Sequence, residues 1–192
     1  SNDSEVVVYA CGMLPYAVRA WWVLRYAGHN NVRILNSGLS AWEKAGGPIE
    51  QEARHYDPSV FTARFNPTMF ASKEEVLASM QDDNVVTVDV LPMESYEASH
   101  IVGSTCLPCL DLMQGMDYFL PDNQLVSRLS EISKHKRIIT YCGGGIAAAI
   151  NATAHLITGY ENVAIYDGSM YEWLAEGLPV KGNGEWEVWF KK

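Results

Sequence analysis

The sequence predicts an α/β fold in which a parallel sheet is flanked by helices. Two observations support this prediction. Apolar, β-branched runs that suit buried strands alternate along the chain with segments of helical pattern. A set of short motifs from the first 50 residues also recurs after residue 137, so one strand–helix–strand unit occurs twice.

The first unit covers residues 1–50 and alternates strand and helix. Its apolar runs have the length of buried strands, and Gly28 directly follows its main helix, as glycine often does at a helix end. The expected elements are a strand at 5–9, a helix at 16–27, a strand at 32–35 and a short helix that begins at Ser40 and is ended by Gly46-Gly47-Pro48.

A polar stretch with two prolines, residues 51–67, is expected to be a linker, and residues 68–192 to form a second, complete unit. A capping box at Ser72 opens the first helix of that unit. Its expected elements are a helix at 72–80, a strand at 85–90, a long loop at 89–116, a helix at 123–133, a strand at 137–140, a helix at 148–157 and a C-terminal strand at 184–190.

The two units match motif by motif. Val7-Val8-Tyr9 corresponds to Ile139-Thr140-Tyr141, and Asn36-Ser37-Gly38 with Trp42 corresponds to Asp167-Gly168-Ser169 with Trp173. The first unit repeats only the back half of the second, so the chain is expected to start in the middle of a domain. The first unit would then have an exposed strand edge and an exposed apolar helix surface. We expect a second chain, or a second copy of this one, to cover them.

The segment Cys142-Gly143-Gly144-Gly145-Ile146-Ala147 lies between an expected strand and an expected helix. Glycines let the backbone curl so that successive N–H groups face one point, and the positive end of the helix adds to that field. Both effects favour a thiolate, so Cys142 is the candidate nucleophile. The alternative is a structural cysteine beside a tightly packed turn. In the first unit Ala10 stands where Cys142 stands in the second.

The composition of the chain argues against several classes of function. A formal net charge of −9 argues against nucleic acid or an anionic membrane as a partner, and no apolar run is long enough to span a bilayer. Four cysteines in 192 residues do not indicate a disulfide scaffold and fit a reducing compartment, so a cytoplasmic location is expected. The sequence opens with Ser-Asn-Asp rather than Met, so it says nothing about a signal that precedes it.

With these pieces placed, the chain resembles the tandem rhodanese-type sulfurtransferases, which use thiosulfate or 3-mercaptopyruvate. The resemblance rests on the Tyr141-Cys142-Gly loop, on Tyr166-Asp167-Gly168-Ser169 with Glu172-Trp173, and on Asp89 followed by Tyr96 and His100-Ile101-Val102-Gly103. It implies a rhodanese-like parallel sheet flanked by helices, with residues 1–50 as the back half of an inactive domain and 68–192 as the catalytic domain.

The resemblance also implies the chemistry. Cys142 would take sulfane sulfur from a small anionic donor as a persulfide and pass it to a thiol or to cyanide. The backbone N–H groups from Gly143 through Gly144, Gly145 and Ile146 to Ala147 would bind the anionic sulfur. No metal and no organic cofactor is implied.

Three departures from the family pattern concern the donor. The family usually has an arginine two residues after the strand-end aspartate, where this chain has Leu91. Mercaptopyruvate-using members tend to have hydroxyl side chains where this chain has Gly144 and Ala147, and thiosulfate-specific members tend to have basic residues in the loop, which is neutral here. Weak activity with both donors is therefore expected.

Two alternative interpretations assign the chain to other functional classes of protein. Cysteine phosphatases need an arginine six residues after the cysteine, and Ala148 stands there, which argues against that class. A non-catalytic binding or regulatory module on a rhodanese-like scaffold is favoured by Leu91 and Ala10 and opposed by the intact Cys142 loop. Cys106-Leu107-Pro108-Cys109 is more typical of core packing than of a redox pair or a zinc site.

Overall fold

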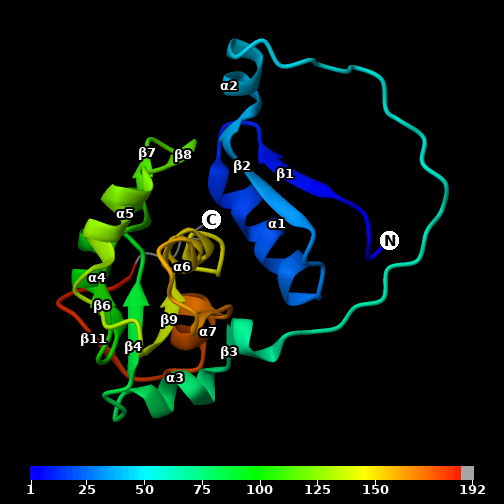
Figure 1. Cartoon of the computed structure of the whole chain (residues 1–192). Helices are drawn as coiled ribbons and strands as arrows, with labels where there is room; N and C mark the ends of the chain where they lie inside the picture. The colour runs from blue at the N-terminus through cyan, green and yellow to red at the C-terminus, as the bar shows by residue number, and fades with distance from the viewer. Residues whose placement is uncertain (187–192) are drawn as a thin grey trace.

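The computed structural model describes residues 1–186, and its central element is a five-stranded sheet (Figure 1). All neighbouring strands in this sheet are parallel, which confirms the predicted fold class. The strand order is β3 (Phe70–Ala71), β10 (Val163–Tyr166), β9 (Arg137–Tyr141), β4 (Val85–Asp89) and β6 (Thr105–Cys106).

Helices cover both faces of the sheet (Figure 1). Leu125 and Leu129 of α5 (Asp122–Leu129) pack in one core cluster with the buried side of α6 (Ala148–Ile157). A second cluster on the other face includes buried side chains of α3 (Lys73–Ser79) and α7 (Ser169–Ala175). Ile138 belongs to the first cluster and its neighbour Ile139 to the second, as the alternation of side chains along a strand requires.

Several predicted boundaries are confirmed closely. The Ser72 side chain accepts a hydrogen bond from the Glu75 N–H at 3.2 Å, so Ser72 caps the start of α3 as predicted, while the Glu75 carboxylate accepts a hydrogen bond from Arg137. Helix α6 has the bounds that the sequence predicts, whereas α5 ends at Leu129 rather than at residue 133.

The expectation of a plain loop over residues 89–116 is wrong. This segment contains several elements, and each is too short to show a periodicity in the sequence. They are α4 (Met93–Ala98), β5 (His100–Ile101), β6, the 3₁₀ helix η2 (Cys109–Leu112) and β7 (Met113–Gln114), which pairs with β8 (Tyr118–Phe119).

The C-terminal segment runs back along α4. Strand β11 (Val180–Lys181) pairs antiparallel with β5, and the Asn183 and Gly184 N–H groups donate to the carbonyls of Glu97 and Ala98. Residues 184–186 of the expected C-terminal strand are irregular, and the remainder of that strand lies outside the described residues.

The first unit has a sheet of its own. Strands β1 (Val6–Ala10) and β2 (Val32–Gly38) are parallel and are connected by α1 (Leu14–Tyr26), after which comes α2 (Leu39–Lys44). Helix α1 begins two residues before the predicted start, with Pro15 in its first turn, where the missing N–H of proline is harmless.

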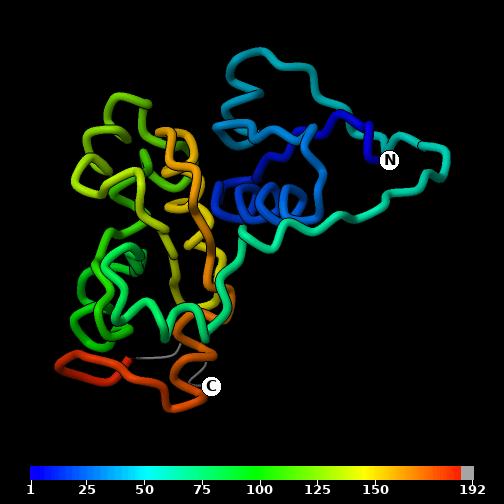
Figure 2. Tube along the Cα trace, turned by 60° about the horizontal axis from the view of Figure 1, so that its bottom comes forward, coloured from blue at the N-terminus to red at the C-terminus, as the bar shows by residue number. Residues whose placement is uncertain are grey.

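Residues 47–66 have no regular secondary structure and form the long arc that Figure 2 shows between α2 and the 3₁₀ helix η1 (Pro67–Met69). The end of this arc is held against α1, because the Arg64 and Asn66 N–H groups donate to the carbonyls of Ala27 and Tyr26 at 2.9 and 2.8 Å. The domain division at residues 50 and 67 stays a prediction.

The sequence repeat is also a repeat of structure. Helix α1 connects β1 to β2 as α6 connects β9 to β10, with parallel pairing in both cases. The two equivalent helices pack against each other (Figure 1), and Val18 and Trp22 of α1 belong to the same core cluster as Ala149 and Ile150 of α6. Each unit therefore buries its connecting helix against that of the other.

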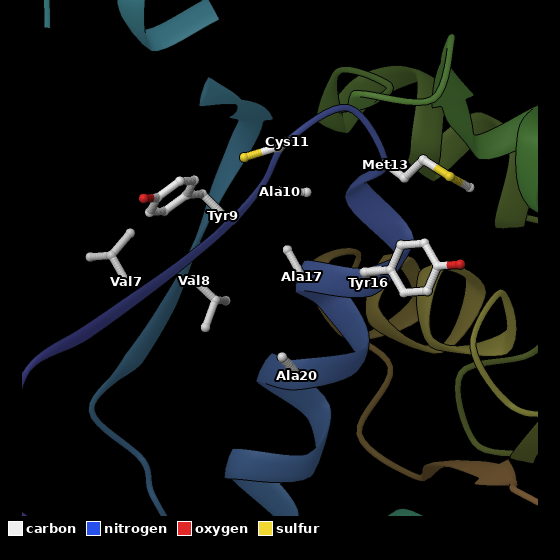
Figure 3. A pocket seen from close by; sticks show the side chains of 9 residues that line it. All are labelled: Val7, Val8, Tyr9, Ala10, Cys11, Met13, Tyr16, Ala17 and Ala20. Carbon is white, nitrogen blue, oxygen red and sulfur yellow. The ribbon is translucent and has the colours of Figure 1, made fainter. Parts of the chain in front are cut away.

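One edge of β1 is open in the described structure. In the second unit β9 is flanked by β10 and β4, whereas β1 pairs with β2 alone among residues 1–186. A hollow of about 570 Å³ lies beside β1, and Figure 3 shows the apolar side chains along it, which come from β1, from the turn that follows and from α1. Val7, Tyr9 and Tyr16 are each more than half exposed.

Candidate active site

Cys142 follows β9 directly, in the middle of the parallel sheet, and only 3% of its surface is exposed. Its backbone is fixed from the side of α7. The Cys142 N–H donates to the Ser169 hydroxyl at 3.2 Å, and the Met170 N–H donates to the Cys142 carbonyl at 3.0 Å. The position of the thiol is therefore set by a helix that begins 27 residues later in the chain.

Ser169 holds an uncommon backbone conformation to do this. Its φ of 51° lies in the left-handed region, which costs energy for a residue with a side chain. Its hydroxyl also donates to the Tyr166 carbonyl at 2.8 Å, so the side chain joins the end of β10 to the Cys142 loop. The sequence analysis used Ser169 only as part of a motif and missed this role.

Each of the three glycines after Cys142 lies close to a different neighbour. Gly145 has a φ of +79°, and a Cβ atom there would lie 2.5 Å from Asp167 Oδ1. A Cβ at Gly144 would lie 2.9 Å from the Tyr171 ring, and one at Gly143 would lie 3.3 Å from the Trp186 ring. Gly145 is thus required by its backbone conformation and by the close approach of Asp167, whereas Gly144 and Gly143 lie close against Tyr171 of α7 and Trp186 of the C-terminal segment.

Tyr171 and Trp186 form an aromatic wall against the first part of the loop. Their ring centroids lie 5.4 Å apart at 69°. The Tyr171 N–H donates to the Gly143 carbonyl at 3.0 Å, and Trp186 is 9% exposed. The two rings lie against Gly143 and Gly144, and Gly144 and Ile146 remain exposed to solvent. No pattern in the sequence placed Trp186 there, because its segment reaches the site only through the pairing of β11 with β5.

The loop offers unused donors. Within residues 1–186, the backbone N–H groups of Gly143, Gly144, Gly145, Ile146 and Ala147 donate to no protein acceptor. Helix α6 begins at the next residue and presents its positive end to the same region. Free N–H groups beside a buried thiol suit an anion, which is the role that the sequence analysis predicts for these five residues.

Asp89 and Tyr141 lie side by side at the ends of β4 and β9. The Asp89 carboxyl is fully buried and accepts the Leu91 N–H at 2.9 Å. Burial raises its pKa from 3.8 to about 6, although the Leu91 N–H and the Tyr141 hydroxyl partly oppose this. Burial and the nearby carboxyl group also raise the pKa of Tyr141, whose hydroxyl accepts the Ile101 N–H at 3.0 Å.

Leu91 lies where the family pattern has an arginine, and its side chain is half-buried against both core clusters. Its carbonyl accepts a hydrogen bond from the Cys106 thiol at 3.7 Å. An apolar side chain therefore fills the position expected to bind the donor.

The other cysteines are placed differently. Burial raises the pKa of the Cys106 thiol to about 12 and that of the Cys109 thiol to about 11, so both stay protonated at neutral pH. Cys109 packs against the core cluster, in agreement with the core-packing interpretation. All four cysteines are unpaired, and Cys11 is exposed at the end of β1. Residues 1–186 contain no cluster of His, Cys, Asp or Glu side chains that could hold a metal ion.

An ion pair from the first unit reaches this site. Arg19 of α1 donates through Nη2 to Asp167 Oδ1 at 2.6 Å, and its guanidinium lies over the Phe70 ring at 5.2 Å. Asp167 Oδ1 is the oxygen that closely approaches Gly145. The sequence analysis missed this contact, because the spacing of Arg19 and Asp167 along the chain carries no signal of their contact.

Comparison with known proteins identifies the family of this chain. The rhodanese-like domain family matches residues 72–176. Thiosulfate sulfurtransferase from Bos taurus is 30% identical over 93% of this chain and 66% of its own length, and 3-mercaptopyruvate sulfurtransferase from Escherichia coli is 30% identical over 94% and 69%. The names of these relatives are those of enzymes.

One similar solved structure is the crystal structure of SseA from Escherichia coli, described as having the rhodanese fold of 3-mercaptopyruvate sulfotransferases. It superposes on this chain with a TM-score of 0.79 at 29% identity, and the match covers 88% of this chain and 68% of that one. The chain spans about two thirds of the length of the curated relatives that it matches. The family match covers more than half of the chain and coincides with the sheet that carries Cys142. This chain therefore belongs to the rhodanese-like domain family.

Proposed function

We propose that the protein is a sulfurtransferase that moves sulfane sulfur from a small anionic donor, such as thiosulfate or 3-mercaptopyruvate, to a thiol or to cyanide through a persulfide on Cys142. The observation that carries the proposal is a buried thiol beside five backbone N–H groups that have no protein acceptor within residues 1–186. The names of the curated relatives support the same class of reaction.

With thiosulfate, the Cys142 thiolate attacks the outer sulfur, the sulfur–sulfur bond breaks and sulfite leaves with the electron pair. With 3-mercaptopyruvate, the carbon–sulfur bond breaks and the enolate of pyruvate takes the thiol proton. Both routes leave a persulfide anion, which the N–H groups of Gly143 to Ala147 stabilise. An acceptor thiolate or cyanide then attacks the outer sulfur and regenerates the Cys142 thiolate.

Intact-mass measurement tests the proposal. After incubation with thiosulfate or, separately, with 3-mercaptopyruvate, the protein is expected to gain one sulfur atom, and cyanide is expected to remove it. A protein that never gains sulfur from either donor would favour the other candidate, a non-catalytic binding or regulatory module. Leu91 is the observation that favours this second candidate, because it leaves the donor without the usual arginine.

Replacing Leu91 by arginine tests how the donor is held. A charge-assisted hydrogen bond to the donor anion is worth about 1.5–3 kcal/mol. Leu91→Arg is therefore expected to lower KM for both donors roughly ten- to a hundred-fold, with a smaller change in kcat. Leu91→Met, which keeps the volume without the charge, is the control. An unchanged or higher KM in a variant that circular dichroism shows to be folded would mean that the donor is held elsewhere.

We also propose that the open edge of β1 is covered by a segment from a second chain, which pairs with β1 as β4 pairs with β9. The supporting observations are the repeat of structure and the hollow beside β1. The four unpaired cysteines fit assembly in a reducing compartment such as the cytoplasm.

For this covered edge, the expected result in analytical ultracentrifugation is a particle heavier than one chain, or a second polypeptide on a denaturing gel. Val7→Lys should weaken the association, because it places a charge beside the open edge. Val126→Lys is the matched control, since Val126 is similarly exposed on α5. A monodisperse monomer in dilute solution would contradict the proposal.

A further inference from the structure

One residue outside the second unit contacts the Cys142 loop through a single intermediary. Asp167 Oδ1 lies 2.6 Å from Arg19 Nη2 and also lies against the backbone of Gly145, where an added Cβ would be 2.5 Å away. The same carboxylate oxygen therefore contacts both the first unit and the loop that surrounds the thiol.

This placement raises an electrostatic problem for the proposed function. A carboxylate at the loop repels an anionic sulfur donor and the persulfide anion, and the net charge of −9 gives no compensating attraction. The side chain of Arg19 is the less exposed partner of this ion pair, at 23% against 55% for Asp167. A half-buried cation is screened less than an exposed one, so its effect on the loop is retained at moderate salt.

The fold does not require an arginine at this position. Gly28 matches Gly159 in the repeat, so Arg19 matches Ile150, a fully buried core residue of α6. The helices α1 and α6 pack against each other, and an aliphatic side chain satisfies that packing in the second unit. Arg19 Nη1 is buried and has no hydrogen-bond acceptor among residues 1–186, which opposes stability.

We infer that Arg19 is a positioning residue of the first unit that neutralises Asp167 and so keeps the Cys142 loop receptive to anions. The inference rests on the proposed function, because an anion-receptive loop matters only if the protein binds an anionic sulfur donor. It assigns the unit without a nucleophile a part in the site of the unit that has one. Arg19 acts through Asp167 and does not touch the donor.

The test compares alkylation of Cys142 by anionic iodoacetate and by neutral iodoacetamide, with the modified residue identified by peptide mapping. The ratio of the iodoacetate rate constant to the iodoacetamide rate constant reports the electrostatic potential at the thiol. Access to the thiol and its thiolate fraction affect both reagents alike and so cancel in this ratio. In Arg19→Met the ratio is expected to fall about tenfold. In Arg19→Met/Asp167→Asn it should return close to the wild-type value, and Arg19→Lys should retain it.

Arg25→Met is the matched control, because Arg25 lies on the same helix but stacks on Trp21, away from the loop. Its ratio is expected to be unchanged. With sulfur donors, Arg19→Met should raise KM about tenfold for monoanionic 3-mercaptopyruvate and about a hundredfold for dianionic thiosulfate, since the Coulomb energy doubles with the charge.

An unchanged alkylation ratio in Arg19→Met, or a double variant no better than Arg19→Met, would overturn the inference. The second result would show that Arg19 acts as packing or contacts the donor itself. A wild-type protein that gains no sulfur from either donor would overturn the proposed function instead, and the alkylation ratios would still decide the role of Arg19.

Discussion

Cys142→Ser is expected to abolish sulfur transfer, with a loss of activity on the order of 10⁴-fold or more, as when other enzymes lose a covalent nucleophile. A serine hydroxyl stays protonated at neutral pH and is a far weaker nucleophile than a thiolate. The fold should survive, because serine is smaller than cysteine and the backbone contacts to Ser169 and Met170 do not involve the side chain. The measurements are the rate of thiocyanate formation with cyanide and the intact mass after exposure to the donor.

The matched control for this variant is Cys11→Ser, at the exposed cysteine that follows Ala10 in the repeat. Cys106→Ser and Cys109→Ser should also retain most of the activity, because burial keeps those thiols protonated. Full activity in Cys142→Ser would exclude Cys142 as the nucleophile, and sulfur found on another cysteine would move the site to that residue.

Asp89→Asn is expected to remove a large pH dependence of stability. The pKa of Asp89 is about 6 in the folded protein, against an ordinary value of 3.8. A carboxyl whose pKa is raised by folding stabilises the protein fully below pH 3.8, and this contribution is lost as the pH rises through 6. The difference corresponds to about 3 kcal/mol in the free energy of unfolding.

Wild type should therefore lose stability between about pH 4 and pH 7 relative to Asp89→Asn, and the variant should be the more stable protein at pH 8. Cys106 and Tyr141, which adjoin Asp89, have raised pKa values and do not titrate in this range. Denaturant unfolding at several pH values measures the difference. Asp83→Asn, at an exposed position in the turn before β4, is the control. Equal pH slopes in wild type and Asp89→Asn would contradict the assignment.

The sequence by itself determined the parts of this protein whose signals are local. The β-branched run before Tyr141 and the glycines after Cys142 located β9 and the start of α6, and Ser72 with Glu75 located the start of α3. Strand and helix alternation then sufficed for a parallel sheet, because connections of this kind place helices on its faces. The motif repeat and the cysteine were likewise visible without coordinates.

The elements between Asp89 and Met116 were not visible, since strands of two residues carry no periodicity and are formed by their partners. The sequence also gave an incomplete reason for the glycines. Gly145 needs its backbone conformation, but the close packing of Gly143 and Gly144 comes from Trp186 and Tyr171, which approach from distant segments.

The tertiary structure alone decided how charge is arranged around the thiol. Burial of Asp89, the placement of Ser169 behind Cys142 and the pairing of Arg19 with Asp167 all depend on which strand ends and helices meet in space. Local sequence fixes backbone propensity over a few residues, whereas burial and electrostatic fields are set by neighbours that can be far away in the chain. The candidate nucleophile could therefore be proposed from one loop, but the residues that surround it could not.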